Sequence, residues 1–171
     1  MRIEDNFLDQ DKFNELQNFF MGDSLPWFYW PRIDSQDDVD KYQFYHSFYN
    51  NNNAISSFIN ILNPILDVLK LVSIWRIKAN LLTRTSDIIE NSFHVDMGLS
   101  QDVPFPEEKL NQWTTSIFYL NTNNGYTKFE DGTKINSIAN RMVTFPANMK
   151  HTGTSCTDEK IRVVINFNYF K

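Results

Sequence analysis

The 171-residue sequence contains a single cysteine, Cys156, so no disulfide can form within the chain. It also lacks a long apolar run, because the most hydrophobic stretch, 65–75, is interrupted by Asp67 and Lys70 and is too short to span a bilayer. The first residues are acidic and contain no apolar segment typical of a secretory signal. These absences predict a soluble, cytoplasmic protein of a reducing compartment, with no membrane partner.

Positive charge is also scarce, since 16 Lys and Arg residues face 21 Asp and Glu residues and the net charge is -5. Binding to a phosphate backbone needs a basic surface, so nucleic acid is disfavoured as the main partner. The sequence is 42% hydrophobic and 15% aromatic, which favours a globular fold over a disordered one. The length predicts one domain, large enough for a substantial core.

The first part of the chain predicts helices and a few extended segments. Apolar spacing predicts a helix over 10–21, begun by Asp9 and ended by Gly22. An apolar stripe over 55–69 predicts a second helical region, capped by Asn53, in which Pro64 kinks the helix or starts a new turn. Two aromatic segments are expected to be extended: 25–34, whose prolines favour a sheet edge, and 42–49.

The second part of the chain predicts many strands joined by turns. Residues 83–91 are expected to form a loop, and 98–112 a surface loop that borders the site. Helices followed by many short strands indicate an α+β protein with an antiparallel sandwich or barrel backed by helices. The strands are expected at 71–82, 113–120, 126–130, 135–145 and 160–170.

The segment Phe93-His94-Val95-Asp96-Met97 carries the most distinctive chemistry. In an extended chain His94 and Asp96 point to one face, about 7 Å apart, and can close on one metal ion. A second imidazole would complete a two-histidine, one-carboxylate triad, which suits non-haem Fe(II) and leaves positions open. The triplet alone is a weak signal, because it also arises by chance.

His151 is the candidate third ligand, since it stands 11 residues before Arg162, enough for a loop and entry into a neighbouring strand. On that last strand Arg162, Val164, Asn166 and Asn168 share one face, and Val163, Ile165, Phe167 and Tyr169 share the other, which is apolar and should pack. In an ordinary sandwich the polar face meets water. Inside a barrel, a buried Arg162 would need a carboxylate partner, which a guanidinium binds with two parallel hydrogen bonds.

Other candidate residues keep structural interpretations. We interpret His46 as a histidine packed beside aromatic residues rather than a metal ligand. Arg76 and Arg84 could reach the mouth of the site, but surface ion pairs are the expectation for both. The four tryptophans are interpreted as core or edge aromatics, although the aromatic segments 27–30 and 42–49 could border a substrate groove.

Taken in order, the motifs resemble those of the Fe(II)/2-oxoglutarate-dependent dioxygenases, most closely the prolyl-hydroxylase-like branch, over about residues 70–170. Similar small proteins are encoded by phages of marine bacteria, which would place this protein in the host cytoplasm. The resemblance rests on His94-Val95-Asp96, Ser116-Ile117-Phe118-Tyr119-Leu120-Asn121, Asn124-Gly125-Tyr126-Thr127, Arg141-Met142-Val143-Thr144-Phe145-Pro146, His151 and Arg162.

The resemblance implies a double-stranded β-helix, a jelly-roll or cupin-like barrel over 71–171, with 1–70 as its support and N-terminal helices packed on the major sheet. It implies Fe(II) held by His94, Asp96 and His151. It also implies that Arg162 and Tyr119 bind the distal carboxylate of the cosubstrate 2-oxoglutarate and that Asn166 faces the same cavity. O2 would be the oxidant, and a peptide or small molecule would be hydroxylated with release of succinate and CO2.

One position departs from the family pattern. Relatives often carry a further tyrosine on the strand before the His-x-Asp loop, where this sequence has Leu82, with Asn80 and Arg84 nearby. The departure concerns part of the cosubstrate pocket, so the resemblance alone does not carry prolyl specificity over to this sequence. The retained Asp96 argues against a halogenase, because a halide would need the coordination position that this carboxylate occupies. Leu82, Phe145 and Ile117 are expected either to wall the site or to be plain core.

Two other functions compete with a hydroxylase. One is a non-enzymatic, cupin-like module that binds a metal or a carbohydrate and does not bind 2-oxoglutarate. The other is a related oxygenase that demethylates nucleic acid, which the acidic balance disfavours. The substrate is expected to be set by 98–112 and the aromatic N-terminal part, and the oligomeric state is left open.

Overall fold

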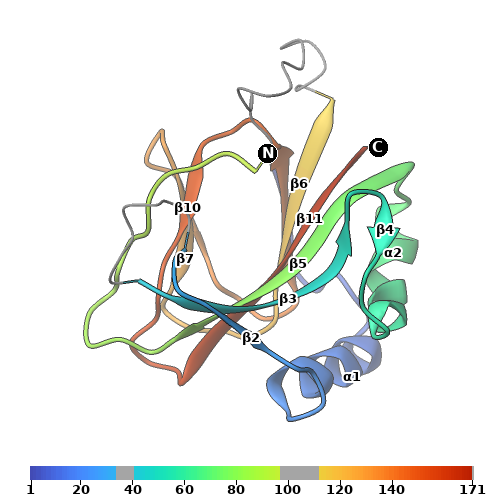
Figure 1. Ribbon diagram of the computed structural model, residues 1–171. Coiled ribbons are helices and arrows are strands. Elements are labelled where there is room, and N and C mark those ends of the chain that lie inside the picture. Colours follow the sequence, from blue (N-terminus) through green and yellow to red (C-terminus); the bar gives the residue numbers. More distant parts are fainter. Residues whose placement is uncertain (34–40, 97–111, 171) are drawn as a thin grey trace.

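The computed structural model describes residues 1–33, 41–96 and 112–170, and these form two antiparallel sheets with two α-helices (Figure 1). The large sheet has the strand order β1-β9-β6-β11-β5-β3-β2, with β4 paired to β3. Its strands are β1 (Arg2–Glu4), β2 (Phe28–Trp30), β3 (Gln43–Asn50), β4 (Asn53–Ala54), β5 (Ser73–Thr83), β6 (Trp113–Tyr119), β9 (Arg141–Pro146) and β11 (Ile161–Phe170).

The small sheet lies across the large one and closes the barrel. It has the order β10-β7-β8, formed by β7 (Tyr126–Phe129), β8 (Lys134–Asn136) and β10 (His151–Gly153). Single bridges from Glu90 to Thr154 and from His94 to His151 add the segment after β5 to its edge. Apolar side chains of both sheets meet between them, so the fold is the expected double-stranded β-helix.

The helices cover the outer face of the large sheet. Helix α1 (Gln10–Met21) has the predicted bounds and ends at Gly22, and its buried side chains are Phe13, Leu16 and Phe20. A 3-10 helix, η1 (Ile59–Leu62), precedes α2 (Asn63–Leu69), and Pro64 stands in the first turn of α2. Pro64 thus starts a new helix, because its fixed φ suits a first turn and its missing N–H costs nothing there. None of the helices described here is long and apolar enough to cross a membrane.

Strand β11 lies in the middle of the large sheet, between β5 and β6. One of its faces packs in the core, and the other lines the barrel interior. Val163, Ile165, Phe167 and Tyr169 are buried in the core under the helices, as the alternation predicted. The opposite face turns toward the small sheet and carries the polar residues. Arg162 and Asn166 therefore point from the centre of the large sheet into the barrel interior.

Three details of the sequence prediction are wrong. The expected strand over 135–145 is two strands in different sheets, because Asn140 adopts a left-handed conformation with φ 61° and separates β8 from β9. Asn53 belongs to β4 and does not cap a helix. Strand β1 has no counterpart in the prediction. Segment 25–34 forms only the short strand β2, at the edge where its prolines predicted it.

Candidate metal and cosubstrate site

His94 and His151 are brought together by backbone pairing. The His94 N–H donates to the His151 carbonyl at 3.0 Å, and the His151 N–H donates to the His94 carbonyl at 2.9 Å. Directly opposed residues in such a pair project their side chains to the same face. Their ring centroids consequently lie 4.7 Å apart.

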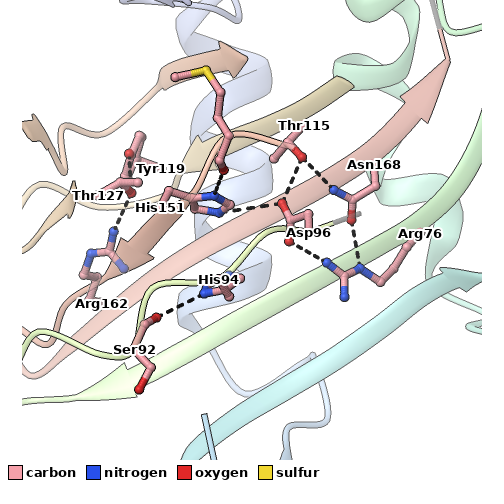
Figure 2. Close-up of polar contacts among 11 residues, drawn as sticks. Arg76, Ser92, His94, Asp96, Thr115, Tyr119, Thr127, His151, Arg162 and Asn168 are labelled. Atoms are coloured by element: carbon pink, nitrogen blue, oxygen red, sulfur yellow. Dashed lines mark hydrogen bonds and ion pairs between the residues drawn. The ribbon is translucent and has the colours of Figure 1, made fainter. Parts of the chain in front are cut away.

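Asp96 joins the two imidazoles, and one ligand atom from each residue lies within 4.8 Å of the others. The Nδ1 of His151 lies 3.0 Å from the Met149 carbonyl, and that of His94 lies 3.3 Å from the Ser92 carbonyl (Figure 2). A carbonyl only accepts, so each Nδ1 carries the proton and each Nε2 carries the lone pair. Two Nε2 atoms and a carboxylate are a donor set that fits Fe(II).

The carboxylate of Asp96 is buried, with 2% of the side chain exposed, and both of its oxygens accept hydrogen bonds. Arg76 donates from Nη2 to Oδ1 at 2.7 Å, and Thr115 donates from Oγ1 to Oδ2 at 2.9 Å. Burial alone would raise the pKa of Asp96, but the charge of Arg76, together with the hydrogen bond from Thr115, outweighs it and lowers that pKa. Asp96 is therefore held as an anion, the form that binds a metal.

Arg162 lies deeper in the barrel and is 3% exposed. Its Nε donates to Ser137 at 2.8 Å, and its Nη2 is 3.4 Å from the hydroxyl of Thr127, which also accepts from Tyr119 at 2.8 Å (Figure 2). Within the described residues no carboxylate pairs with Arg162, and burial lowers its pKa. A buried guanidinium without an internal anion fits an anionic ligand such as the carboxylate of 2-oxoglutarate.

A cavity of about 60 Å³ connects these groups, since it is lined by both imidazoles, Arg162 and Asn166. Asn80 and Leu82 form another part of its wall, and Leu82 is directly opposite Arg162 in the strand register. In the part of the chain that the structure describes, no donor reaches the buried Oδ1 of Asn80 or of Asn166. Two buried amide oxygens thus stand ready to accept hydrogen bonds from a ligand.

A second cavity of about 260 Å³ opens beside Asp96 and His94, and its lining is mostly polar. It shares Asn80 and Asn166 with the first cavity, so the two are neighbours. The remaining polar side chains come from β3 and β5: Gln43, Arg76 and Lys78.

No protein-family model matches the sequence, and no curated protein matches it. Solved structures do match the fold. A prolyl hydroxylase from Trichoplax adhaerens, in complex with a hypoxia inducible factor peptide, has a TM-score of 0.65 at 14% identity, covering 99% of this chain and 82% of that one. A Pseudomonas putida prolyl-4-hydroxylase has a TM-score of 0.57 at 11% identity, covering 99% and 92%. HygX from Streptomyces hygroscopicus, with nickel, 2-oxoglutarate and hygromycin B bound, has a TM-score of 0.60 at 9% identity, covering 98% and 81%.

The fold is that of the 2-oxoglutarate-dependent oxygenases. The resemblance to their prolyl-hydroxylase-like branch is confirmed at the level of the fold. At these identities the likeness establishes the architecture, and the chemistry has to be argued from the site itself. The phage source and the cytoplasmic location stay predictions.

Within this oxygenase fold the structure brings together His94, Asp96 and His151, with Arg162 facing the same cavity. His46 lies elsewhere, as expected: its Nδ1 is 2.7 Å from the Pro26 carbonyl, and its Nε2 is 2.8 Å from the Ser56 hydroxyl. The predicted loop 98–112 falls almost wholly outside the described residues.

Sequence reasoning missed several residues of the site. Arg76 was expected in a surface ion pair and instead binds a candidate metal ligand. Thr115 and Ser137 gave no signal, because Ser and Thr are common in strands and turns, and Thr127 appeared only as part of a motif with no role assigned. Asn168 did give a sequence signal, since strand alternation places it on the same face of the last strand as Arg162. In the structure it is fully buried.

Proposed function

We propose that this protein is an Fe(II)- and 2-oxoglutarate-dependent oxygenase that hydroxylates a peptide residue, an amino acid or another small molecule. The observation that carries the proposal is the position of Arg162, a buried guanidinium that pairs with no carboxylate among the described residues. It lies on the same cavity as His94 and His151, which Asp96 joins in the candidate metal site. A metal-binding module alone would have no use for that guanidinium.

Each residue has a defined task in this proposal. The two imidazoles and Asp96 would hold iron, and Arg162 with Tyr119 would hold the distal carboxylate of 2-oxoglutarate. Asn166 would donate or accept a hydrogen bond within the same cavity. Bound iron, 2-oxoglutarate and O2 would supply the oxidising chemistry, releasing succinate and CO2. The barrel residues orient the bound groups and exclude water.

The polar cavity beside Asp96 supports a polar substrate. Gln43, Lys78 and Asn80 place polar groups and a positive charge on its wall. A purely apolar substrate would offer no hydrogen bond to the buried Oδ1 of Asn80, which no donor reaches within the described residues. HygX was solved with hygromycin B bound and the Trichoplax enzyme with a peptide fragment, so bound molecules of both kinds are compatible with the fold.

The test is anaerobic titration with Fe(II) and 2-oxoglutarate, followed by thermal unfolding. A ligand at a hundred times its dissociation constant stabilises the native state by about 2.7 kcal/mol, so the melting temperature should rise by several degrees. Slow succinate formation should accompany it in air. Asp96→Ala should abolish both effects, and Arg162→Ala should abolish only the contribution of 2-oxoglutarate.

A cupin-like metal or carbohydrate binder predicts a different result. In that case the metal would stabilise the protein, 2-oxoglutarate would add nothing, and Arg162→Ala would leave metal binding unchanged. A salt-dependent affinity for single-stranded DNA would instead favour a nucleic-acid substrate.

A further inference from the structure

Three polar residues form a row across the middle of the large sheet. Asn168 on β11 is directly opposite Arg76 on β5 and directly opposite Thr115 on β6. Opposed residues share a face, so all three point toward the barrel interior, where Asp96 lies (Figure 2). Asn168 and Thr115 are completely buried, and Arg76 is partly exposed at the polar cavity.

The row and Asp96 form a closed ring of hydrogen bonds. Arg76 Nε donates to Asn168 Oδ1 at 2.8 Å, and Asn168 Nδ2 donates to Thr115 Oγ1 at 2.9 Å. The Thr115 hydroxyl donates a hydrogen bond to Asp96 Oδ2, and Arg76 Nη2 closes the ring by donating to Oδ1. Every donor in the ring has an acceptor, so the rotamers of all four residues fix one another.

The ring distinguishes the two oxygens of Asp96. Oδ2 lies 3.7 Å from His151 Nε2, so it is the oxygen turned toward the shared ligand position. Oδ1 accepts a hydrogen bond from the guanidinium of Arg76, so this oxygen is already engaged. The geometry therefore favours a carboxylate that binds through one oxygen only and leaves the other coordination positions open.

Arg76 also places a fixed positive charge next to the ligand. A nearby cation destabilises a metal ion in proportion to the charge on that metal, so it disfavours Fe(III) more than Fe(II). In addition, a carboxylate that is hydrogen-bonded to a cation donates less electron density. Both effects act in the same direction and raise the reduction potential of bound iron.

We propose that Arg76, held by Asn168 and Thr115, is a positioning residue that keeps Asp96 a one-oxygen ligand and stabilises iron in the Fe(II) state. This inference rests on the proposed function, because it assumes that iron occupies the site. It assigns separate tasks to the two properties of Arg76. The branched shape holds Asp96 in place through Asn168, and the charge sets the oxidation state.

The experiment separates these tasks with two variants of Arg76. Metal affinity is measured by anaerobic titration of Co(II), followed through its ligand-field absorption, and the Fe(III)/Fe(II) potential by equilibration with redox dyes. Arg76→Lys keeps the charge but cannot bridge Asp96 and Asn168, so affinity should fall about 10- to 100-fold while the potential stays close to that of the wild type. Arg76→Gln should lower both affinity and potential.

Two further variants serve as a control and as a replacement for Arg76→Gln. Arg84→Gln removes the same charge from an exposed position just beyond β5 and should change neither quantity. If Arg76→Gln does not fold, as judged by thermal unfolding of the metal-free protein, Asn168→Ala replaces it and should reproduce the loss of affinity seen with Arg76→Lys.

Unchanged Co(II) affinity and unchanged potential in Arg76→Gln would overturn the inference while leaving the proposed function standing. Unchanged affinity in Asn168→Ala would overturn it in the same way. A wild-type chain that takes up no metal would overturn the proposed function, and the inference with it.

Discussion

Gly125 stands where the side chain of Arg162 passes into the barrel. A Cβ at this position would lie 2.7 Å from Arg162 Cδ and 2.7 Å from the Ser155 carbonyl, closer than real Cβ atoms come to their neighbours. The residue is therefore glycine because the guanidinium and a backbone segment both need the space. A small residue in the turn before β7 thus decides where the large side chain of Arg162 on β11 can point.

Gly125→Ala should displace Arg162 and weaken 2-oxoglutarate binding. Overpacking of this kind costs about 1–3 kcal/mol, so the affinity should fall about tenfold or more while metal affinity changes little. Gly153→Ala is the matched control, because its Cβ would be an ordinary 3.5 Å from Arg162 Nη1. Calorimetric titration measures the affinity of both variants for 2-oxoglutarate. Equal affinities would show that a Cβ at position 125 does not displace Arg162.

Single residues were predictable where a local rule applies. The direction of Arg162 followed from strand alternation, and the grouping of His94 with Asp96 followed from their spacing. The role of Arg76 did not follow, because it depends on which residues lie opposite Asn168 on two other strands. Register between strands that are far apart in sequence is set by the whole sheet and leaves no local pattern.

At the level of elements, Asn140 links the start of α1 to the sheet. Its side chain accepts from the Leu8 N–H at 2.9 Å and donates to the Leu8 carbonyl at 2.8 Å, and it is buried. Its φ of 61° is the left-handed conformation that asparagine tolerates and that separates β8 from β9. The prediction of one continuous strand over 135–145 failed at this residue. Helix α1 was predicted to its bounds because its apolar periodicity is a local signal, although the side chain of Asp9 makes no capping hydrogen bond.

Asn140→Ala should destabilise the protein without changing the metal site. Two buried hydrogen bonds of about 1 kcal/mol each are lost, and alanine adds about 1 kcal/mol of strain in this conformation. Asn140→Gly loses the bonds without the strain, so it should be the more stable variant of the two by about 1 kcal/mol. Chemical denaturation of both variants checks the order, and a more stable alanine variant would contradict the backbone argument.

Glu90 attaches the segment that carries His94 and Asp96 to the small sheet. It accepts from Lys128 and from Tyr126, each at 2.7 Å, and hydrogen bonds from these two residues lower its pKa. A lowered folded-state pKa means that the stabilisation is present above the unfolded value of about 4.3 and is lost as pH falls through the folded value.

Glu90→Gln should therefore lower the melting temperature at pH 7 and have no effect at strongly acidic pH. The pair is about one-third exposed, so the difference in unfolding free energy should be at most about 1 kcal/mol. Glu130→Gln, which removes the more exposed pair with Lys150, is the control and should change little. A difference between Glu90→Gln and wild type that persists at low pH would argue against an ionic origin.

Over the whole molecule, the class of fold was predictable and the closure of the barrel was not. The order of helices and strands, with the motif set, predicted the double-stranded β-helix. The pairing of His94 with His151 joins residues 57 positions apart, and only the assembled sheets bring them into register. Sequence spacing could permit that meeting but could not require it, because loops of many lengths close at similar entropic cost.

Substitutions on the two faces of β11 should have different effects: on the core face they should lower stability, and on the cavity face they should weaken ligand binding. Ile165 is fully buried under the helices, so Ile165→Ala should lower the unfolding free energy by about 2–5 kcal/mol. Asn166 faces the cavity with a buried Oδ1 that no donor reaches among the described residues, so Asn166→Ala removes a group that these residues do not satisfy. Its cost in stability should therefore be within about 0.5 kcal/mol.

Ligand binding should show the reverse order. Well below its melting temperature, Ile165→Ala should bind 2-oxoglutarate as the wild type does, because its cavity-side neighbours are unchanged. Asn166→Ala should bind it more weakly, because a hydrogen-bonding group next to Arg162 is gone. If Ile165→Ala weakens 2-oxoglutarate binding as much as Asn166→Ala does, a change on the core face of β11 alters the cavity face, and the separation of stability from binding is wrong.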